Sequence, residues 1–225
     1  LVLVLAGAMA LATENIDPPP LQPPHVPDQS LMLPMRDGVR IATDVYLPDG
    51  AGPWPVIYFV TPYGKDVLNP TTYPLDQADK PELFYWSDHG YAAVCQDYRG
   101  RFASEGTFDL FASAGRDGEE TARWILKQPW SDGNIVTMGS SASGMIQLFQ
   151  VTHGMPGLRA QSMSVGQPDL YEVFYQDGAF RKNFSENWMT SFGPAGTALL
   201  ENAIKPNVSA TAPVWDEFRL YDQLA

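Results

Sequence analysis

The sequence of 225 residues contains a single cysteine, Cys95. One cysteine cannot form an intramolecular disulfide, and because Cys95 lies in an apolar run, we expect a buried thiol. Basic residues are also scarce: 14 lysines and arginines stand against 26 aspartates and glutamates, and the net charge is −12. This charge argues against nucleic acid as a partner and against binding to anionic membrane surfaces, since both require a basic surface.

The sequence also lacks the patterns that hold metals and phosphates. No group of histidine, cysteine and carboxylate residues has metal-ligand spacing, and no glycine-rich loop matches a phosphate-binding motif. We therefore expect no cofactor. Hydrophobic residues make up 44% and charged residues 18%, a composition typical of a globular protein. The length suits one α/β domain with a sizeable core.

The amino-terminal apolar run, residues 1–12, is too short to span a membrane. It contains two A-x-A patterns, Ala8–Ala10 and Ala10–Ala12, that match a signal-peptidase site. We interpret residues 1–12 as a signal peptide remnant and expect a secreted or periplasmic protein without stable membrane insertion; a buried helix is the alternative. Residues 13–29 form a proline-rich leader, for which we expect an extended conformation.

From residue 30 the pattern changes to alternating strands and helices. Two short arms, residues 30–35 and 39–47, flank Arg36-Asp37-Gly38 and predict an antiparallel hairpin. Strands of a parallel sheet are predicted from apolar runs, at residues 55–61, 91–96, 135–138 and 158–165. Helices are predicted between them, at residues 81–89, 117–128 and 145–151. This alternation is typical of a mainly parallel α/β sheet, in which we expect the first three of these strands to be neighbours.

The stretch Ile-Val-Thr-Met-Gly-Ser-Ser-Ala-Ser-Gly, residues 135–144, carries the candidate nucleophile. A strand that turns sharply into a helix with a serine at the apex is a nucleophile elbow. We assign Ser141, two residues after Gly139, to the apex, where the N–H groups of the helix start suit a developing oxyanion. The match to G-x-S-x-G is incomplete, because Ser143 stands at the second glycine position and Gly144 follows it. A serine-rich linker is the alternative.

Residues 167–225 are rich in aromatic side chains that do not alternate as in a strand. We expect short helices that cover the carboxyl edge of the sheet, and ordinary core packing is the alternative for most of these rings. The aromatic residues are Tyr171, Phe174, Tyr175, Phe180, Phe184, Trp188 and Phe192.

Five ordered motifs together resemble the amino-terminal part of acyl esterases of the cocaine esterase and X-prolyl dipeptidyl peptidase group, which includes the α-amino-acid ester hydrolases. The motifs are Met-Arg-Asp-Gly-Val (35–39), Thr-Pro-Tyr-Gly-Lys (61–65), Gln-Asp-Tyr-Arg-Gly-Arg-Phe-Ala-Ser-Glu-Gly (96–106), residues 124–130 leading into Gly-Ser-Ser (139–141), and Gly-Ala-Phe-Arg (178–181). The resemblance covers roughly residues 30–192. It implies an α/β-hydrolase fold over residues 30–166 and the start of a helical cap, truncated, over residues 167–225.

The resemblance also implies roles for individual residues. The family pattern at the elbow is Gly-x-Ser-Tyr-x-Gly, which places Ser141 at the nucleophile and explains the late Gly144. Ala142 replaces the usual tyrosine, whose backbone N–H contributes to the oxyanion hole, and a backbone donor survives this substitution. Tyr63 matches the tyrosine whose hydroxyl is the second oxyanion donor. A loop aromatic half-buried against the sheet is the alternative for Tyr63.

A serine nucleophile needs a base, and only three histidines are present. His25 lies in the leader, and His89 precedes a strand, at the end of the sheet away from Ser141. His153 lies twelve residues beyond Ser141, or ~18 Å along a helix. The resemblance implies later strands that carry the acid and the histidine, followed by a β-sandwich, and neither is present. We interpret the chain as a fragment cut at both ends that is inactive alone; a pseudoenzyme is the alternative.

The predicted function is that of a serine hydrolase that cleaves carboxylic esters or amides through an acyl-enzyme on Ser141, with a small ester or a short peptide as substrate. An X-prolyl dipeptidyl peptidase is an alternative. Some relatives bind a substrate amino group through acidic residues near the oxyanion tyrosine, but here Gly64 and Lys65 follow Tyr63, with Asp66 next. This favours an esterase. A non-catalytic binding module is the third possibility.

Overall fold

The computed structural model describes residues 26–68, 83–167 and 169–192. The predicted signal peptide remnant, most of the proline-rich leader and residues 193–225 of the predicted cap lie outside these residues. The described strands are β1 (Gln29–Pro34), β2 (Arg40–Tyr46), β3 (Trp54–Thr61), β4 (Ala92–Asp97), β5 (Ser131–Ser140), β6 (Leu158–Ser164), β7 (Tyr175–Gln176) and β8 (Ala179–Phe180). The helices are α1 (Leu83–Asp88), α2 (Ala114–Ile125), α3 (Ala142–His153), α4 (Leu170–Phe174) and α5 (Lys182–Phe192), with a short 3₁₀ turn, η1 (Lys65–Leu68).

The main sheet has six strands in the order β1-β2-β4-β3-β5-β6. β1 and β2 form the predicted antiparallel hairpin, and β2 pairs antiparallel with β4. The remaining pairs, β4 with β3, β3 with β5 and β5 with β6, are all parallel. The mainly parallel sheet and the adjacency of the strands that contain residues 55–61, 91–96 and 135–138 are therefore confirmed.

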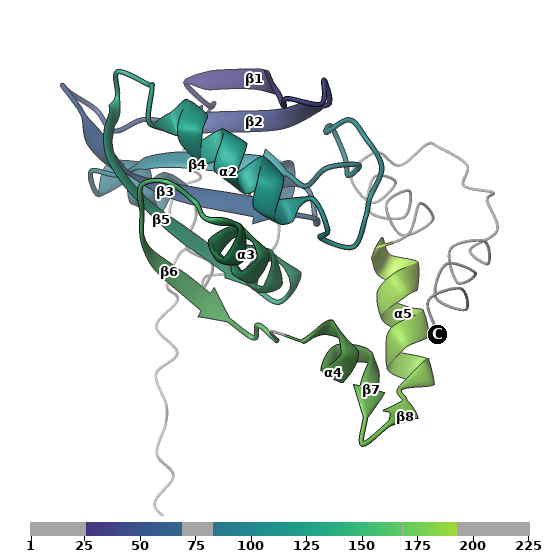
Figure 1. Ribbon diagram of the computed structural model, residues 1–225. Helices are drawn as coiled ribbons and strands as arrows, with labels where there is room; N and C mark the ends of the chain where they lie inside the picture. Colours follow the sequence, from purple (N-terminus) through teal and green to yellow (C-terminus); the bar gives the residue numbers. More distant parts are fainter. Residues whose placement is uncertain (1–25, 69–82, 168, 193–225) are drawn as a thin grey trace, which may run out of the picture.

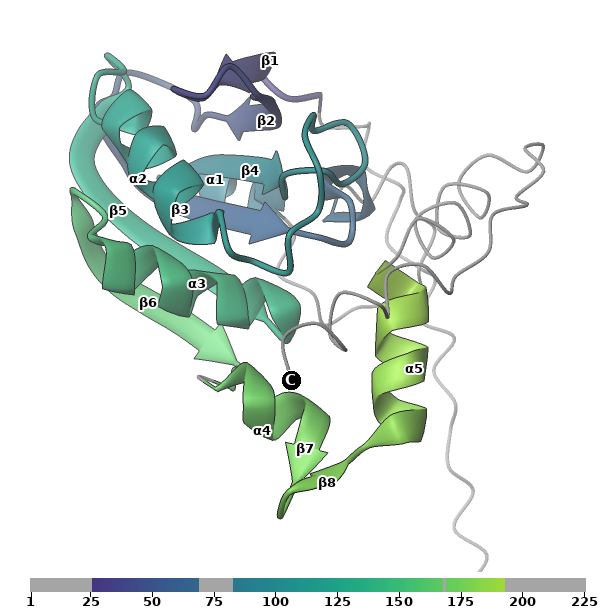
Figure 2. The ribbon, with the colours of Figure 1, turned by 45° about the vertical axis from the view of Figure 1, so that its right-hand side comes forward.

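Alternation along β4 explains how helices cover both faces of the sheet. Ala92 and Val94 belong to the main hydrophobic cluster, which includes Ala122 and Ile125 of α2. Ala93 and Cys95 point the other way, into a smaller cluster against which Trp86 of α1 packs. Figures 1 and 2 show α2 and α3 side by side on one face of the sheet.

Cys95 is fully buried, as expected, and burial raises the pKa of its thiol. No helix among the described residues is long and apolar enough to cross a membrane.

Two helices begin earlier than the sequence predicted. α2 starts at Ala114 instead of residue 117, because its first turns lie directly against α3. A Cβ on Gly115 would come within 2.6 Å of the His153 Cβ, and one on Gly118 within 2.6 Å of the Gln150 Cγ. α3 starts at Ala142 instead of residue 145, immediately after the candidate nucleophile.

The segment after β6 contains the predicted short helices α4 and α5, and also a small hairpin that was not predicted. β7 and β8 pair antiparallel around Asp177 and Gly178, which both have positive φ, 51° and 80°. Asp-Gly is the residue pair that such two-residue turns favour. α4 and α5 follow the carboxyl end of β6 (Figures 1 and 2). Val173 of α4 and Trp188 of α5 pack against the hydrophobic cluster that contains Met145 of α3.

Candidate active site

Ser141 occupies a sharp turn between β5 and α3, as the sequence predicted. Its backbone has φ 55° and ψ −126°, a conformation that is costly for a residue with a side chain. The turn is held by three backbone hydrogen bonds: the Ser141 N–H donates to the Ser164 carbonyl at 3.0 Å, and the N–H groups of Gly144 and Met145 donate to the Ser141 carbonyl at 2.9 Å each. This is the geometry of a nucleophile elbow.

The two glycines that flank the serines are there for steric reasons. A Cβ on Gly139 would lie 2.6 Å from the Ser143 carbonyl oxygen, closer than Cβ atoms approach other heavy atoms in proteins. A Cβ on Gly144 would lie 3.1 Å from the Ser164 carbonyl oxygen and from the Met163 Cγ. The elbow therefore requires glycine at 139 and a very small residue at 144, whereas position 143 tolerates a serine.

Tyr63 and Ala142 meet at Ser141. The Tyr63 hydroxyl lies 3.2 Å from the Ser141 Oγ and accepts a hydrogen bond from the Ala142 N–H at 3.3 Å. Tyr63 follows the carboxyl end of β3, Ser141 follows that of β5, and the two strands are neighbours, so the topology itself brings the groups together. The three residues singled out from the sequence are thus gathered at one point at the carboxyl edge of the sheet, where Tyr63 and Ser141 are half-buried and Ala142 is buried.

A buried cluster of charges, not anticipated from the sequence, lies next to the Tyr63 turn. Burial raises the pKa of Asp97 to about 7, although its carboxylate accepts hydrogen bonds from the N–H groups of Lys65 and Ala103. Burial by itself would lower the pKa of Lys65, but its bonds to Asp44 at 2.6 Å and Asp66 at 2.9 Å outweigh this and raise the pKa. Polar residues at the carboxyl ends of neighbouring parallel strands were the available sequence signal.

The described histidines have other partners. His153, at the far end of α3, lies 3.4 Å from the Glu119 carboxylate. His89 stacks on the Tyr85 ring at 4.0 Å, with its Nδ1 2.5 Å from the Tyr85 carbonyl oxygen. His25 falls outside the described residues. Within the part that the structure describes, Ser141 therefore has no histidine as a hydrogen-bond partner.

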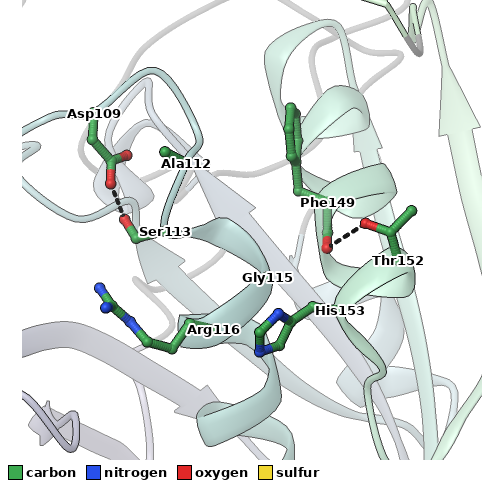
Figure 3. Close-up of a pocket in the computed structure, with 8 residues that line it drawn as sticks. All are labelled: Asp109, Ala112, Ser113, Gly115, Arg116, Phe149, Thr152 and His153. Carbon is green, nitrogen blue, oxygen red and sulfur yellow. Dashed lines mark hydrogen bonds between the residues drawn. The ribbon is translucent and has the colours of Figure 1, made fainter.

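A surface hollow of about 540 Å³ lies between the start of α2 and the end of α3 (Figure 3). It is lined by Asp109, Ala112, Ser113, Gly115, Arg116, Phe149, Thr152 and His153. Phe149 is eight residues beyond Ser141, or about 12 Å along the helix axis. The hollow is therefore separate from the elbow. No group of side chains that could hold a metal ion is found among residues 26–68, 83–167 and 169–192.

A serine elbow at the carboxyl edge of a mainly parallel sheet, facing a hydroxyl and a backbone N–H donor, places the chain among the α/β-hydrolases. The sequence profile of the X-Pro dipeptidyl-peptidase (S15) family matches residues 37–223. The chain belongs to this family, which confirms the resemblance inferred from the five motifs.

Individual relatives agree with this placement. The cocaine esterase of Rhodococcus sp. (strain MB1 Bresler) is 40% identical over 154 residues, which cover 64% of this chain and 24% of that protein. An α-amino acid ester hydrolase structure is 26% identical, with a TM-score of 0.58, over 76% of this chain and 32% of the other. A CocE/NonD family hydrolase from Staphylococcus aureus is 25% identical, with a TM-score of 0.63, over 80% and 35%. The chain thus spans a quarter to about a third of the length of these relatives.

Proposed function

We propose that this chain provides the nucleophile and the oxyanion hole of a serine hydrolase that cleaves carboxylic esters through an acyl-enzyme on Ser141. The observation that carries the proposal is the position of the Tyr63 hydroxyl, 3.2 Å from the Ser141 Oγ and 3.3 Å from the Ala142 nitrogen. An esterase needs a hydroxyl nucleophile beside two donors aimed at one oxygen, and these three groups have that arrangement.

The reaction follows from this geometry. The Ser141 Oγ attacks the ester carbonyl carbon while a base outside the described residues, which we propose to be a histidine, takes the serine proton. The carbonyl oxygen becomes an oxyanion that accepts hydrogen bonds from the Ala142 N–H and the Tyr63 O–H. Without substrate, the Ala142 N–H donates to the Tyr63 oxygen. A substrate oxygen would therefore replace the weak hydrogen bond between the Ala142 N–H and the Tyr63 oxygen, and no water-bound N–H group would have to be desolvated.

Collapse of the tetrahedral intermediate completes the first half-reaction. The base returns its proton to the leaving alcohol, and the acyl group remains on the Ser141 Oγ. Water, deprotonated by the same base, then attacks the acyl carbon and releases the carboxylic acid. The two donors act in both halves, since each half passes through an oxyanion at the same place.

The charges beside Tyr63 favour esters over the amino-terminal dipeptides of an X-prolyl dipeptidyl peptidase. A substrate ammonium group needs an acidic partner. Of the three carboxylates in the cluster next to the Tyr63 turn, Asp44 and Asp66 are paired with the Lys65 ammonium group, and Asp97 accepts from two backbone N–H groups. All three are occupied by protein groups, so this side of the site suits a neutral ester.

The test compares adjacent serines in the full-length protein. Ser141→Ala should abolish hydrolysis of p-nitrophenyl butyrate, with a loss of order 10⁶ in kcat. Ser140→Ala is the matched control, because Ser140 is exposed at the end of β5, and it should retain activity. Mass spectrometry should find a fluorophosphonate adduct on Ser141 alone. Turnover that survives in Ser141→Ala would refute the proposal, and a wild-type protein that neither turns over nor reacts would favour a binding module.

A further inference from the structure

We propose that Asp97 is a positioning residue for Tyr63: its carboxylate fixes the turn that presents the Tyr63 hydroxyl to Ser141. This inference rests on the proposed esterase function and extends it to a residue that touches neither substrate nor nucleophile. Asp97 ends β4 directly beside Thr61, the last residue of β3, so the two strands deliver the carboxylate and the tyrosine turn to the same place.

The carboxylate of Asp97 ties two loops together. One oxygen accepts a hydrogen bond from the Lys65 N–H at 2.6 Å, and the other accepts one from the Ala103 N–H at 3.2 Å. Asp97 is 1% exposed, so water does not compete for these contacts. The Lys65 amide lies two residues beyond Tyr63, and its position sets the direction in which the turn leaves the tyrosine.

Arg101 holds the same turn from the other side of Tyr63. Its Nε donates to the carbonyl oxygen of Pro62, the residue before Tyr63, at 3.0 Å. Arg101 is itself buried, with its guanidinium over the ring of Phe102 at 5.4 Å. Tyr63 is thus flanked by one fixed carbonyl group and one fixed amide group, both bound by side chains of the loop that begins at the end of β4.

The turn has little room to move between these contacts. Gly64 has φ +98°, and a Cβ there would lie 3.0 Å from the Phe102 ring. The Tyr63 N–H also donates to the Thr61 Oγ1 at 3.0 Å. The hydroxyl sits at the far end of the tyrosine ring, so a small rotation of the backbone becomes a larger displacement of the donor. A displacement of about 1 Å at a catalytic group can cost of order 10²-fold in rate.

Asp97→Asn tests the inference when it is assayed above the Asp97 pKa of about 7, where the wild-type carboxylate has two acceptors. The substitution keeps the size of the side chain but turns one of the two acceptors into an N–H₂ donor that faces a backbone N–H. In the full-length protein we expect kcat to fall about 10- to 10²-fold, with KM changed less than about 3-fold. Tyr63→Phe alone should cost about 10²–10³-fold. Because Asp97 acts through the Tyr63 hydroxyl, adding Asp97→Asn to Tyr63→Phe should cost less than about 3-fold more.

Asp117→Asn is the matched control. Asp117 is also a buried carboxylate, 8% exposed, but it lies on α2 and binds both Nε and Nη2 of Arg99 at 2.7 Å. Its variant should lower stability while leaving kcat within about 3-fold, and any loss should multiply with that of Tyr63→Phe. Losses of Asp97→Asn and Tyr63→Phe that also multiply would assign Asp97 a purely structural role and overturn the inference.

Hydrogen–deuterium exchange gives a readout that does not depend on catalysis. In Asp97→Asn, amides of residues 63–65 should exchange at least about 10-fold faster, while those of residues 135–150 stay unchanged. Asp117→Asn should leave residues 63–65 protected. An unchanged turn in Asp97→Asn overturns the inference whatever the enzyme does. If the wild type shows no Ser141-dependent turnover, the proposed function is overturned instead. Hydrogen exchange could then still show that Asp97 fixes the Tyr63 turn, but the turn would have no catalytic role.

Discussion

Removal of the Tyr63 hydroxyl is the sharpest test of the proposed oxyanion hole. Tyr63→Phe deletes one oxygen and leaves the ring, so the cavity around Ser141 keeps its shape. It removes the contacts to the Ser141 Oγ at 3.2 Å and to the Ala142 N–H at 3.3 Å. We expect kcat to fall about 10²–10³-fold, or about 2.7–4 kcal/mol of transition-state stabilisation, as for other oxyanion donors. KM should change little, because the ground-state carbonyl carries less charge than the oxyanion.

Stability separates this effect from a folding defect. Both contacts are long and involve neutral groups, so their loss should lower the free energy of unfolding by no more than about 1 kcal/mol. Tyr58→Phe is the control: its buried hydroxyl donates to the Gln96 Oε1 at 2.5 Å, and Tyr58 is paired with Thr137 of β5 and not with Ser141. That variant should lose about 1–3 kcal/mol of stability and keep its kcat.

The assay is the steady-state hydrolysis of a p-nitrophenyl ester by the full-length protein, with thermal unfolding of each variant measured in parallel. A Tyr63→Phe enzyme with kcat within about 3-fold of wild type would refute the oxyanion role, since one lost donor typically costs far more. A rise in KM alone would make Tyr63 a ground-state binding residue instead.

Four further predictions follow from the contacts around the elbow and the sheet edge. Gly139→Ala should cost about 1–3 kcal/mol of stability and reduce kcat, because its Cβ would come within 2.6 Å of the Ser143 carbonyl oxygen; wild-type urea unfolding and kcat in this variant would contradict the steric argument. Asp117→Asn should cost about 3 kcal/mol in urea unfolding, because it leaves the buried Arg99 guanidinium short of its bidentate partner; a loss below 1 kcal/mol would contradict this. The pKa of Asp97 is raised to about 7, above its unfolded value near 4, so its contribution to stability is complete below pH 4 and is lost as the pH rises through 7. The stability difference between wild type and Asp97→Asn in urea titrations should therefore shrink as the pH rises from about 4 to about 7. A difference that grows over this range would show that the pKa is lowered instead. The 225-residue chain alone should hydrolyse p-nitrophenyl esters no better than its Ser141→Ala variant, since neither His89 nor His153 contacts Ser141, and Ser141-dependent turnover would reveal a base within the chain.

The adjacency of the three central strands was predictable because the evidence is local to each strand. The apolar runs at residues 55–61, 91–96 and 135–138 can be buried on both faces only inside a parallel sheet, and they occupy its centre. Element boundaries were less predictable. The start of α2 at Ala114 depends on Gly115 and Gly118 lying against α3, and nothing in the sequence of α2 indicates which surface it will meet.

The residues of the candidate site could also be predicted only in part. Ser141 could be found from the elbow pattern, and Tyr63 and Ala142 from the family motifs, because each lies in a short stretch with its own signature. The contacts that hold Tyr63 could not be found, since Asp97 and Arg101 bind backbone groups, which every residue carries. Only the adjacency of β3 and β4 shows which backbone groups these side chains reach.

The elbow is also supported by contacts outside its own turn, and Gln147 makes several of them. This glutamine of α3 is 2% exposed and accepts a hydrogen bond from the Thr137 hydroxyl of β5 at 2.8 Å. Its amide nitrogen faces the carbonyl oxygen of Ser162 on β6 at 3.2 Å, with that of Gly139 at 3.4 Å. One side chain therefore joins β5, β6 and α3 next to the elbow. Because the Ser141 N–H donates to the Ser164 carbonyl of β6, the strained conformation of Ser141 is supported by the packing of three elements.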